Sequence, residues 1–231
     1  MDHSSPLPDT AFEPLSFSAS AFRLRQFFPT PLLMAPVNEA ERLNEALRET
    51  ILSRTAASQG VLRSNDGGWQ SADDFAAWAG PAGGALLDAA TRLVNQFTGV
   101  QTEAELLRDQ APNWRLNAWA NVNDDGDANF PHHHPGSFWS GVYWVDTGDI
   151  GLEGQNMAGG EFEMQDPRGI LPAFYAPQLK MAVPGCLSAG LSDFITPQAG
   201  VMIIFPSWLV HSVRRYRGSK PRISIAFNFS I

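Results

Sequence analysis

The sequence contains very little cysteine and little positive charge. A single cysteine, Cys186, stands among 231 residues, so no disulfide can form within the chain. Lys and Arg number 16 against 24 Asp and Glu, which gives a net charge of −8, and no basic run occurs. A nucleic-acid surface needs clustered Lys and Arg, so we expect no nucleic-acid partner.

Long hydrophobic segments are missing as well. The apolar run Val201–Phe205 is far shorter than the roughly 20 residues that cross a bilayer. Residues 1–20 lack the basic and apolar pattern of a secretory signal. We therefore expect a cytoplasmic protein with no membrane partner. The apolar fraction of 44% is that of an ordinary globular chain.

Helices are expected in the first half of the chain, after a short strand somewhere within residues 15–33. Asn38 is a candidate N-cap for a helix whose apolar residues recur every four positions as far as Ile51. A second helix is expected over about residues 81–97, with a proline well placed in its first turn. A third helical piece is expected over residues 102–109.

The sequence after Pro112 is typical of β-structure. Five runs alternate apolar and polar residues and are separated by Gly, Pro, Asn and Asp. They are Trp114–Val122, Ser137–Val145, Gly160–Met164, Gly200–Phe205 and Arg222–Ile231. Short, widely spaced strands favour an antiparallel jelly roll over a parallel α/β sheet. The irregular stretch 168–197 is a lid, a disordered loop or a cover for a sheet edge.

We therefore predict one mainly β domain over residues 1–231, with helices in its N-terminal part. Residues 1 to about 110 form a tail, a strand and a helical layer. The core, from about residue 111 to residue 231, is predicted to be a double-stranded β-helix, which is the cupin-like jelly roll.

Four of the five histidines occur at two places in the β-region. His132 and His134 are two residues apart, so in a strand both would point to the same side. His211 follows a separate strand, and the intervening chain is long enough to fold back over the pair. Imidazole binds iron, zinc, copper and nickel, so the three histidines predict a metal site but do not select the metal.

Arg222 and Ser224 are also two residues apart, on the last predicted strand. If Arg222 faces the interior of the jelly roll, its buried charge requires an anion, and its planar fork suits a carboxylate. A dicarboxylic co-substrate would provide that anion. The alternative, in which Arg222 faces outward at the start of the strand, is about equally favoured by the residues alone.

The second half of the chain resembles the 2-oxoglutarate/Fe(II) oxygenase superfamily, in particular a bacterial and phage group related to prolyl hydroxylases. Five segments carry the resemblance and occur in the expected order. They are NFPHHHP (129–135), SGVYW (140–144), GGEFE (159–163), FPSWLVH (205–211) and RISIAFN (222–228). The resemblance implies that His132 begins the metal motif and His211 is the distal ligand.

The same resemblance implies that Arg222, with Ser224 beside it, binds the far carboxylate of 2-oxoglutarate. Tyr143 either offers its hydroxyl to this co-substrate or is an aromatic residue of the core. The superfamily usually has a carboxylate where this sequence has His134.

Three interpretations of that departure remain open. The metal is held by three histidines, or a carboxylate such as Glu161 or Glu163 replaces His134, or a third ligand is missing. We prefer three histidines.

The resemblance implies a dioxygenase that uses Fe(II) and 2-oxoglutarate. It would hydroxylate a small-molecule or peptide substrate with dioxygen and convert 2-oxoglutarate to succinate. One alternative is a three-histidine dioxygenase that does not use 2-oxoglutarate. Another is a cupin-like metal-binding protein without enzymatic activity. The sequence does not indicate the substrate or the oligomeric state.

Overall fold

The computed structural model describes residues 27–151, 159–183 and 190–231. Within it, Pro31–Ile231 forms one compact unit. Most of the segment 15–33, where a strand was predicted, and Cys186 lie outside the described residues. The single domain over the whole chain stays a prediction. No helix in the described ranges is long and apolar enough to span a membrane.

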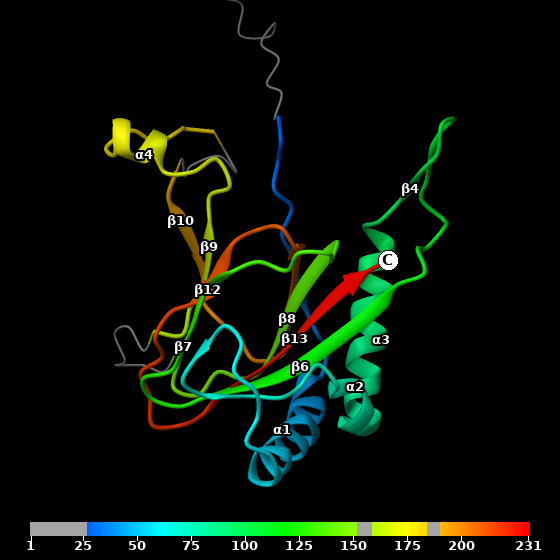
Figure 1. The fold of residues 1–231 in the computed structure, drawn as a ribbon, viewed down its shortest axis with the longest axis vertical. Coiled ribbons are helices and arrows are strands. Elements are labelled where there is room, and N and C mark those ends of the chain that lie inside the picture. Colours follow the sequence, from blue (N-terminus) through cyan, green and yellow to red (C-terminus); the bar gives the residue numbers. More distant parts are fainter. Residues whose placement is uncertain (1–26, 152–158, 184–189) are drawn as a thin grey trace, which may run out of the picture. The chain divides into compact units, whose positions relative to one another are not determined.

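The larger of the two main sheets has six strands, all paired antiparallel. In spatial order they are β1 (Leu33–Pro36), β11 (Val201–Pro206), β8 (Trp139–Asp146), β13 (Arg222–Ser230), β6 (Arg115–Asn123) and β3 (Trp69–Gln70). β8, β13 and β6 form its long central part (Figure 1). Neighbouring strands are far apart in sequence, as in a jelly roll.

The second sheet has five shorter antiparallel strands. In spatial order they are β10 (Ser192–Ile195), β9 (Phe162–Gln165), β12 (His211–Val213), β7 (Ala128–His132) and β2 (Asn65–Asp66). Side chains from both sheets meet in one apolar cluster, which includes Trp144, Phe162 and Phe205. The two sheets form the double-stranded β-helix that the sequence predicted.

The long strands of the larger sheet are buried on both faces. On β8, Val142 and Trp144 point to the inter-sheet cluster, whereas Tyr143 and Val145 belong to a second apolar cluster on the other face. Successive side chains of a strand alternate between faces, so each strand contributes to both clusters. This alternation determines which residues can reach the space between the sheets.

Helices cover the outer face of the larger sheet (Figure 1). They are α1 (Ala40–Ala57), α2 (Phe75–Trp78) and α3 (Gly80–Gln96). The predicted stripe of α1 is confirmed, because Leu47 and Ile51 are fully buried. In α3, Pro81 lies in the first turn as expected. The apolar side chains of both helices thus complete the outer cluster.

Two details of the helix predictions are wrong. α1 begins at Ala40, and its N-cap is Glu39 in a left-handed conformation (φ 51°), so Asn38 lies one residue too early to be the cap. The piece predicted over residues 102–109 is not helical. There, β4 (Val100–Gln101) and β5 (Leu106–Leu107) form a small antiparallel hairpin. Leu106 and Leu107 of β5 pair with residues of β4 across the hairpin, and a helix would not allow this pairing.

The irregular stretch 168–197 includes two short elements in its described parts. α4 (Leu171–Tyr175) is a single short helix, and β10 extends the smaller sheet by pairing with β9. β10 therefore covers the edge of β9, which agrees with one of the three interpretations for this part of the stretch.

Candidate metal centre and anion pocket

Two of the predicted ligands stand opposite each other in the smaller sheet. His132 ends β7, His211 begins β12, and the two residues are cross-strand partners. His134 lies beyond the end of β7, in the following loop, so strand alternation does not position it as predicted. Its backbone N–H donates a hydrogen bond to the carbonyl of Ser207 (3.0 Å), which holds the loop beside the turn before β12.

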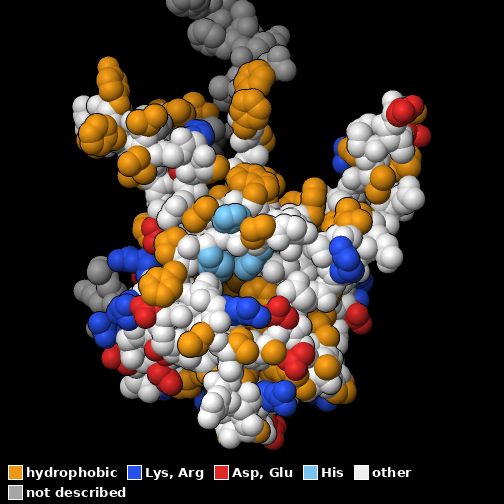
Figure 2. All heavy atoms as spheres, in the orientation of Figure 1, with side chains coloured by type: hydrophobic (Ala, Val, Ile, Leu, Met, Phe, Trp, Pro, Cys, Tyr) orange, Lys and Arg blue, Asp and Glu red, His pale blue; other side chains and the backbone are white. Residues whose placement is uncertain are grey.

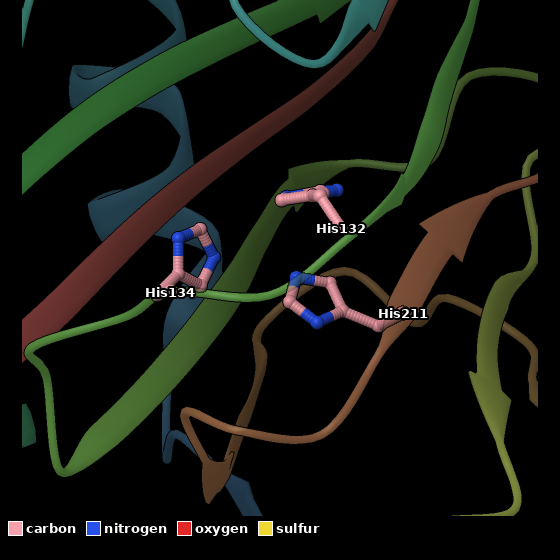
Figure 3. A group of neighbouring side chains, drawn as sticks. All are labelled: His132, His134 and His211. Atoms are coloured by element: carbon pink, nitrogen blue, oxygen red, sulfur yellow. The ribbon is translucent and has the colours of Figure 1, made fainter.

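The three imidazole rings converge on one point (Figure 3). The ring centroids lie 4.4 Å apart for His132 and His211, 5.0 Å for His132 and His134, and 5.1 Å for His134 and His211. One ring nitrogen from each residue falls within 4.8 Å of the others, close enough for all three to bind one metal ion. The strands and the loop therefore bring together the three histidines that the sequence singled out.

Backbone carbonyls fix two of these rings. Nδ1 of His132 lies 2.7 Å from the carbonyl oxygen of Phe130, and Nδ1 of His211 lies 2.8 Å from that of Leu209. A carbonyl only accepts, so Nδ1 carries the proton in both rings and Nε2 keeps its lone pair. A hydrogen bond of this kind commonly sets the tautomer and ring orientation of metal-binding histidines. Phe162 also stacks on His211, with 5.2 Å between centroids.

Burial keeps these imidazoles in the form that binds metal. The pKa of His211 is lowered to about 3 and that of His134 to about 4, mainly because burial removes the rings from water. Positive charge on the neighbouring histidines would lower both pKa values further. Burial also lowers the pKa of His132. All three rings are therefore neutral near pH 7, and a metal ion need not displace protons from them.

The carboxylates that were considered as substitutes for His134 point elsewhere. Phe162 and Met164 of β9 face the inter-sheet cluster, so Glu163 between them faces the opposite side, where Ser212 donates a hydrogen bond to it (3.3 Å). Glu161 pairs with Arg214 (3.9 Å). Among the described residues, neither glutamate joins the histidine group. Of the three interpretations, the three-histidine arrangement is the one that agrees with this geometry.

Arg222 and Ser224 line the same pocket as the three histidines. Arg222 is only 1% exposed, so the alternative in which it faces outward is wrong. Gly160, at φ 75°, allows the chain to pass close by, because a Cβ atom there would lie 3.3 Å from Cδ of Arg222. A side chain at residue 160 would therefore crowd the arginine.

The guanidinium of Arg222 has fewer partners than a buried cation requires. Nη1 donates to Oδ1 of Asn123 (3.2 Å) and Oγ of Ser224 (3.4 Å), while Nε and Nη2 are buried without a hydrogen-bond partner. Among the described residues that line the pocket, none is acidic. Burial lowers the pKa of Arg222 to about 10, so the group is still charged at neutral pH. This arrangement fits an anion that the protein itself does not supply.

Comparison with known proteins agrees with the geometry. Residues 117–228 match the sequence profile of a family described as "Putative 2OG-Fe(II) oxygenase". These residues include the three histidines, Arg222 and Ser224. This part of the chain belongs to the 2-oxoglutarate/Fe(II) oxygenases. The protein is accordingly an oxidoreductase, and the cofactors of its family are Fe(II) and 2-oxoglutarate.

Solved structures of oxygenases share the fold. A prolyl-4-hydroxylase from Pseudomonas putida is 17% identical, with a TM-score of 0.56, and the match covers 87% of this chain and 92% of that chain. HygX from Streptomyces hygroscopicus, solved with nickel and 2-oxoglutarate bound, is 15% identical, with a TM-score of 0.53 and coverages of 87% and 83%.

A third similar structure is a prolyl hydroxylase from Trichoplax adhaerens in complex with a peptide fragment of hypoxia inducible factor. It is 11% identical, with a TM-score of 0.55 and coverages of 86% and 83%. No curated protein sequence matches the chain. At these identities the solved structures establish the double-stranded β-helix.

The predicted role of Tyr143 in this oxygenase is wrong. Tyr143 lies on the outer face of β8, in the cluster covered by the helices, and its hydroxyl donates a hydrogen bond to Oδ1 of Asn44 in α1 (2.6 Å). Burial raises its pKa to about 12. The alternative interpretation, an aromatic residue of the core, is correct, because strand alternation turns residue 143 away from the pocket.

Several polar residues of the oxygenase pocket were not predicted from the sequence. Ser64, Asn121 and Asn129 line it together with the predicted residues. Asn121 had a visible signal: in NAWANVN (117–123), asparagine recurs at positions that share one face of a strand. Ser64 had none, since it comes from a distant loop and approaches Nε2 of His132 only in the folded chain (3.4 Å).

Proposed function

We propose that this protein is an Fe(II)/2-oxoglutarate-dependent dioxygenase that hydroxylates its substrate. The observation that carries the proposal is Arg222: a fully buried guanidinium with two unpartnered nitrogens, in a pocket that also presents three neutral histidines. A dicarboxylic 2-oxo acid has one end for a metal ion and a distant carboxylate for the arginine. Such an acid accounts for the histidines and for the unpartnered guanidinium together.

His132, His134 and His211 would hold Fe(II), and Arg222 with Ser224 would bind the carboxylate farthest from the metal. Iron and 2-oxoglutarate would together supply the chemistry of dioxygen activation. In the balanced reaction, a substrate C–H, dioxygen and 2-oxoglutarate give the C–OH product, succinate and carbon dioxide. One oxygen atom goes to the product and the other to succinate.

The chain's own residues orient the reactants and restrict water. Phe162 and Phe205 pack against His211, with 5.2 and 4.9 Å between ring centroids, and keep one side of the centre apolar. The carbonyls of Phe130 and Leu209 fix the rings of His132 and His211 before any metal binds. Fixed ligands lower the reorganisation that binding requires.

The substrate side of the centre is open and aromatic. Figure 2 shows histidine side chains exposed at the surface with hydrophobic side chains around them. Phe130 and Trp208 lie close to the histidines in sequence and are each more than half exposed. This rim is compatible with an apolar small molecule or with a peptide of the kind present in the Trichoplax complex. A cytoplasmic location and the absence of a nucleic-acid partner stay predictions from the sequence.

The absence of a carboxylate among the candidate ligands favours one rival function. A three-histidine centre retains one more positive charge than a centre with two histidines and a carboxylate, and such a centre can support a dioxygenase that does not use 2-oxoglutarate. Membership of an oxygenase family leaves no reason to retain the non-enzymatic alternative.

Anaerobic titration of the Fe(II)-loaded protein with 2-oxoglutarate tests the proposal. We expect a visible metal-to-ligand charge-transfer band that saturates in the wild type and weakens strongly in Arg222→Ala. Arg215→Ala is the matched control, because Arg215 is an exposed arginine paired with Asp66. If the iron-loaded wild type gives no band, or if Arg222→Ala titrates like the wild type, the rival function is favoured.

A further inference from the structure

Three neighbouring strands place a row of polar side chains on the inner face of the larger sheet. Ser224 of β13 has Asn121 of β6 as its cross-strand partner on one side and Trp144 of β8 on the other. Arg222 is two residues from Ser224 on the same strand and therefore shares its face. Arg222, Ser224 and Asn121 line the pocket, and Trp144 is buried directly behind that lining, next to Ser224 on the same face.

The indole of Trp144 is buried without a hydrogen-bond partner. Its side chain is 0% exposed, and Nε1 has no acceptor within hydrogen-bonding distance. Its neighbours in the inter-sheet cluster, such as Ile203 and Phe205, are apolar and offer none. Buried indole N–H groups usually have a partner, because an unpaired one loses its bond to water without compensation.

The position of this unpaired group is informative. Trp144 is a donor only, and so is a charged arginine, so the unpaired atoms Nε1 of Trp144 and Nε and Nη2 of Arg222 all require an acceptor. Trp144 and Ser224 are cross-strand neighbours, and Ser224 and Arg222 are two residues apart on β13. The three side chains therefore lie on one face of the sheet. A carboxylate, with two oxygens and about four acceptor sites, can satisfy several of them at once.

The other buried tryptophan of the same strand provides a contrast. Trp139 of β8 faces the helices, and its indole N–H donates a hydrogen bond to Oγ1 of Thr98 (2.9 Å). Burial of a tryptophan in this sheet therefore does not by itself leave the indole unpaired. The unpaired indole is the one beside Ser224 and Arg222.

We propose that the indole N–H of Trp144 is a third donor, beside Arg222 and Ser224, for the far carboxylate of a bound dicarboxylic 2-oxo acid. The inference rests on the proposed function, since it requires that such a co-substrate binds. Trp144 is then a determinant of co-substrate specificity: it favours 2-oxo acids that end in a carboxylate over those that end in a methyl group.

Trp144→Phe, which keeps an aromatic ring and removes the N–H, tests this role. Binding is measured anaerobically on the Fe(II) protein with 2-oxoglutarate and with 2-oxovalerate, which has the same number of carbons and no far carboxylate. We expect affinity for 2-oxoglutarate to fall by roughly tenfold or more, the effect of losing a hydrogen bond to a charged group, with little change for 2-oxovalerate. Trp139→Phe is the control, and it should leave the ratio of the two affinities unchanged.

The outcomes separate the two proposals. If the iron-loaded wild type does not bind 2-oxoglutarate, the proposed function fails. If the wild type binds it and Trp144→Phe weakens both acids equally or neither, the role of Trp144 is wrong while the proposed function stands.

A measurement on the unmodified chain applies if Trp144→Phe does not fold. In the protein loaded with Zn(II), a diamagnetic substitute for iron, one of the seven tryptophan indole N–H signals should move downfield in an NMR titration with 2-oxoglutarate. The same signal should stay in place with 2-oxovalerate. If no indole signal distinguishes the two acids, the inference is overturned.

Discussion

His132 and His211 face each other across two antiparallel strands of the smaller sheet, with ring centroids 4.4 Å apart. The metal centre consequently depends on the pairing of β7 with β12. A shift of one residue in this pairing would turn one ring to the opposite face of the sheet. The carbonyls that orient the two rings each come two residues before a histidine: Phe130 lies within β7, and Leu209 lies in the turn that leads into β12.

His134 is the ligand that separates this centre from the usual set of its superfamily, and its replacement gives the first prediction. His134→Ala should abolish most of the stabilisation by Fe(II), which is about 2.7 kcal/mol at a metal concentration 100 times the Kd. His134→Asp should retain it, because a carboxylate completes the usual set. Anaerobic thermal unfolding with and without Fe(II) measures both.

The control for this prediction is His133→Ala. His133 is exposed and does not belong to the converging group, so its loss should leave the metal-dependent shift in Tm unchanged. Equal stabilisation of His134→Ala and wild type by Fe(II) would show that two histidines suffice.

The buried charge of Arg222 should lower the stability of the ligand-free protein, although the same charge enables 2-oxoglutarate to bind. An unpaired buried charge is costly, and well-packed apolar replacements of buried ionic groups are often more stable by 1–4 kcal/mol. We therefore expect Arg222→Met to raise the free energy of unfolding of the ligand-free protein by about 1–3 kcal/mol. The same variant should lose detectable binding of 2-oxoglutarate. Urea unfolding and the charge-transfer titration measure the two effects, and a less stable variant would contradict the first of them.

Tyr143 should matter for stability and not for the co-substrate. Tyr143→Phe removes a hydrogen bond to Asn44 in α1, which typically stabilises a protein by about 1 kcal/mol. Urea unfolding should detect that loss. Affinity for 2-oxoglutarate should stay within about twofold of wild type, because the hydroxyl faces the helices. A tenfold loss of affinity would instead support a contact between the Tyr143 hydroxyl and 2-oxoglutarate.

Asn121 offers a way to fill the anion pocket from within. Asn121 lines the pocket, and its Oδ1 is buried without a partner. Asn121→Asp adds a carboxylate on the strand next to Arg222, so it should pair with the guanidinium and compete with 2-oxoglutarate. We expect the Kd for 2-oxoglutarate to rise at least tenfold at neutral pH. Asn117→Asp, on the same face of β6 and farther from Arg222, should change it little.

The sequence was sufficient where a pattern is local and repeated. Alternating residues located the long strands, and the four-residue stripe that ends at Ile51 located the buried face of α1. It failed where the pattern is short. The segment 102–109 forms part of a hairpin, since pairing of Val100 with Leu107 overrides a weak helical preference. β10 was missed and β7 and β12 were given no bounds for the same reason, because short strands are stabilised by their neighbours.

The sequence by itself determined that candidate metal ligands and an arginine–serine pair occur in the β-region, because each motif is compact along the chain. Only the tertiary structure decided how they combine. The antiparallel pairing of β7 with β12 brings His211 to His132, and the hydrogen bond to Ser207 brings in His134. Burial leaves Arg222 without a protein anion, and strand alternation turns Tyr143 out of the pocket and Trp144 inward.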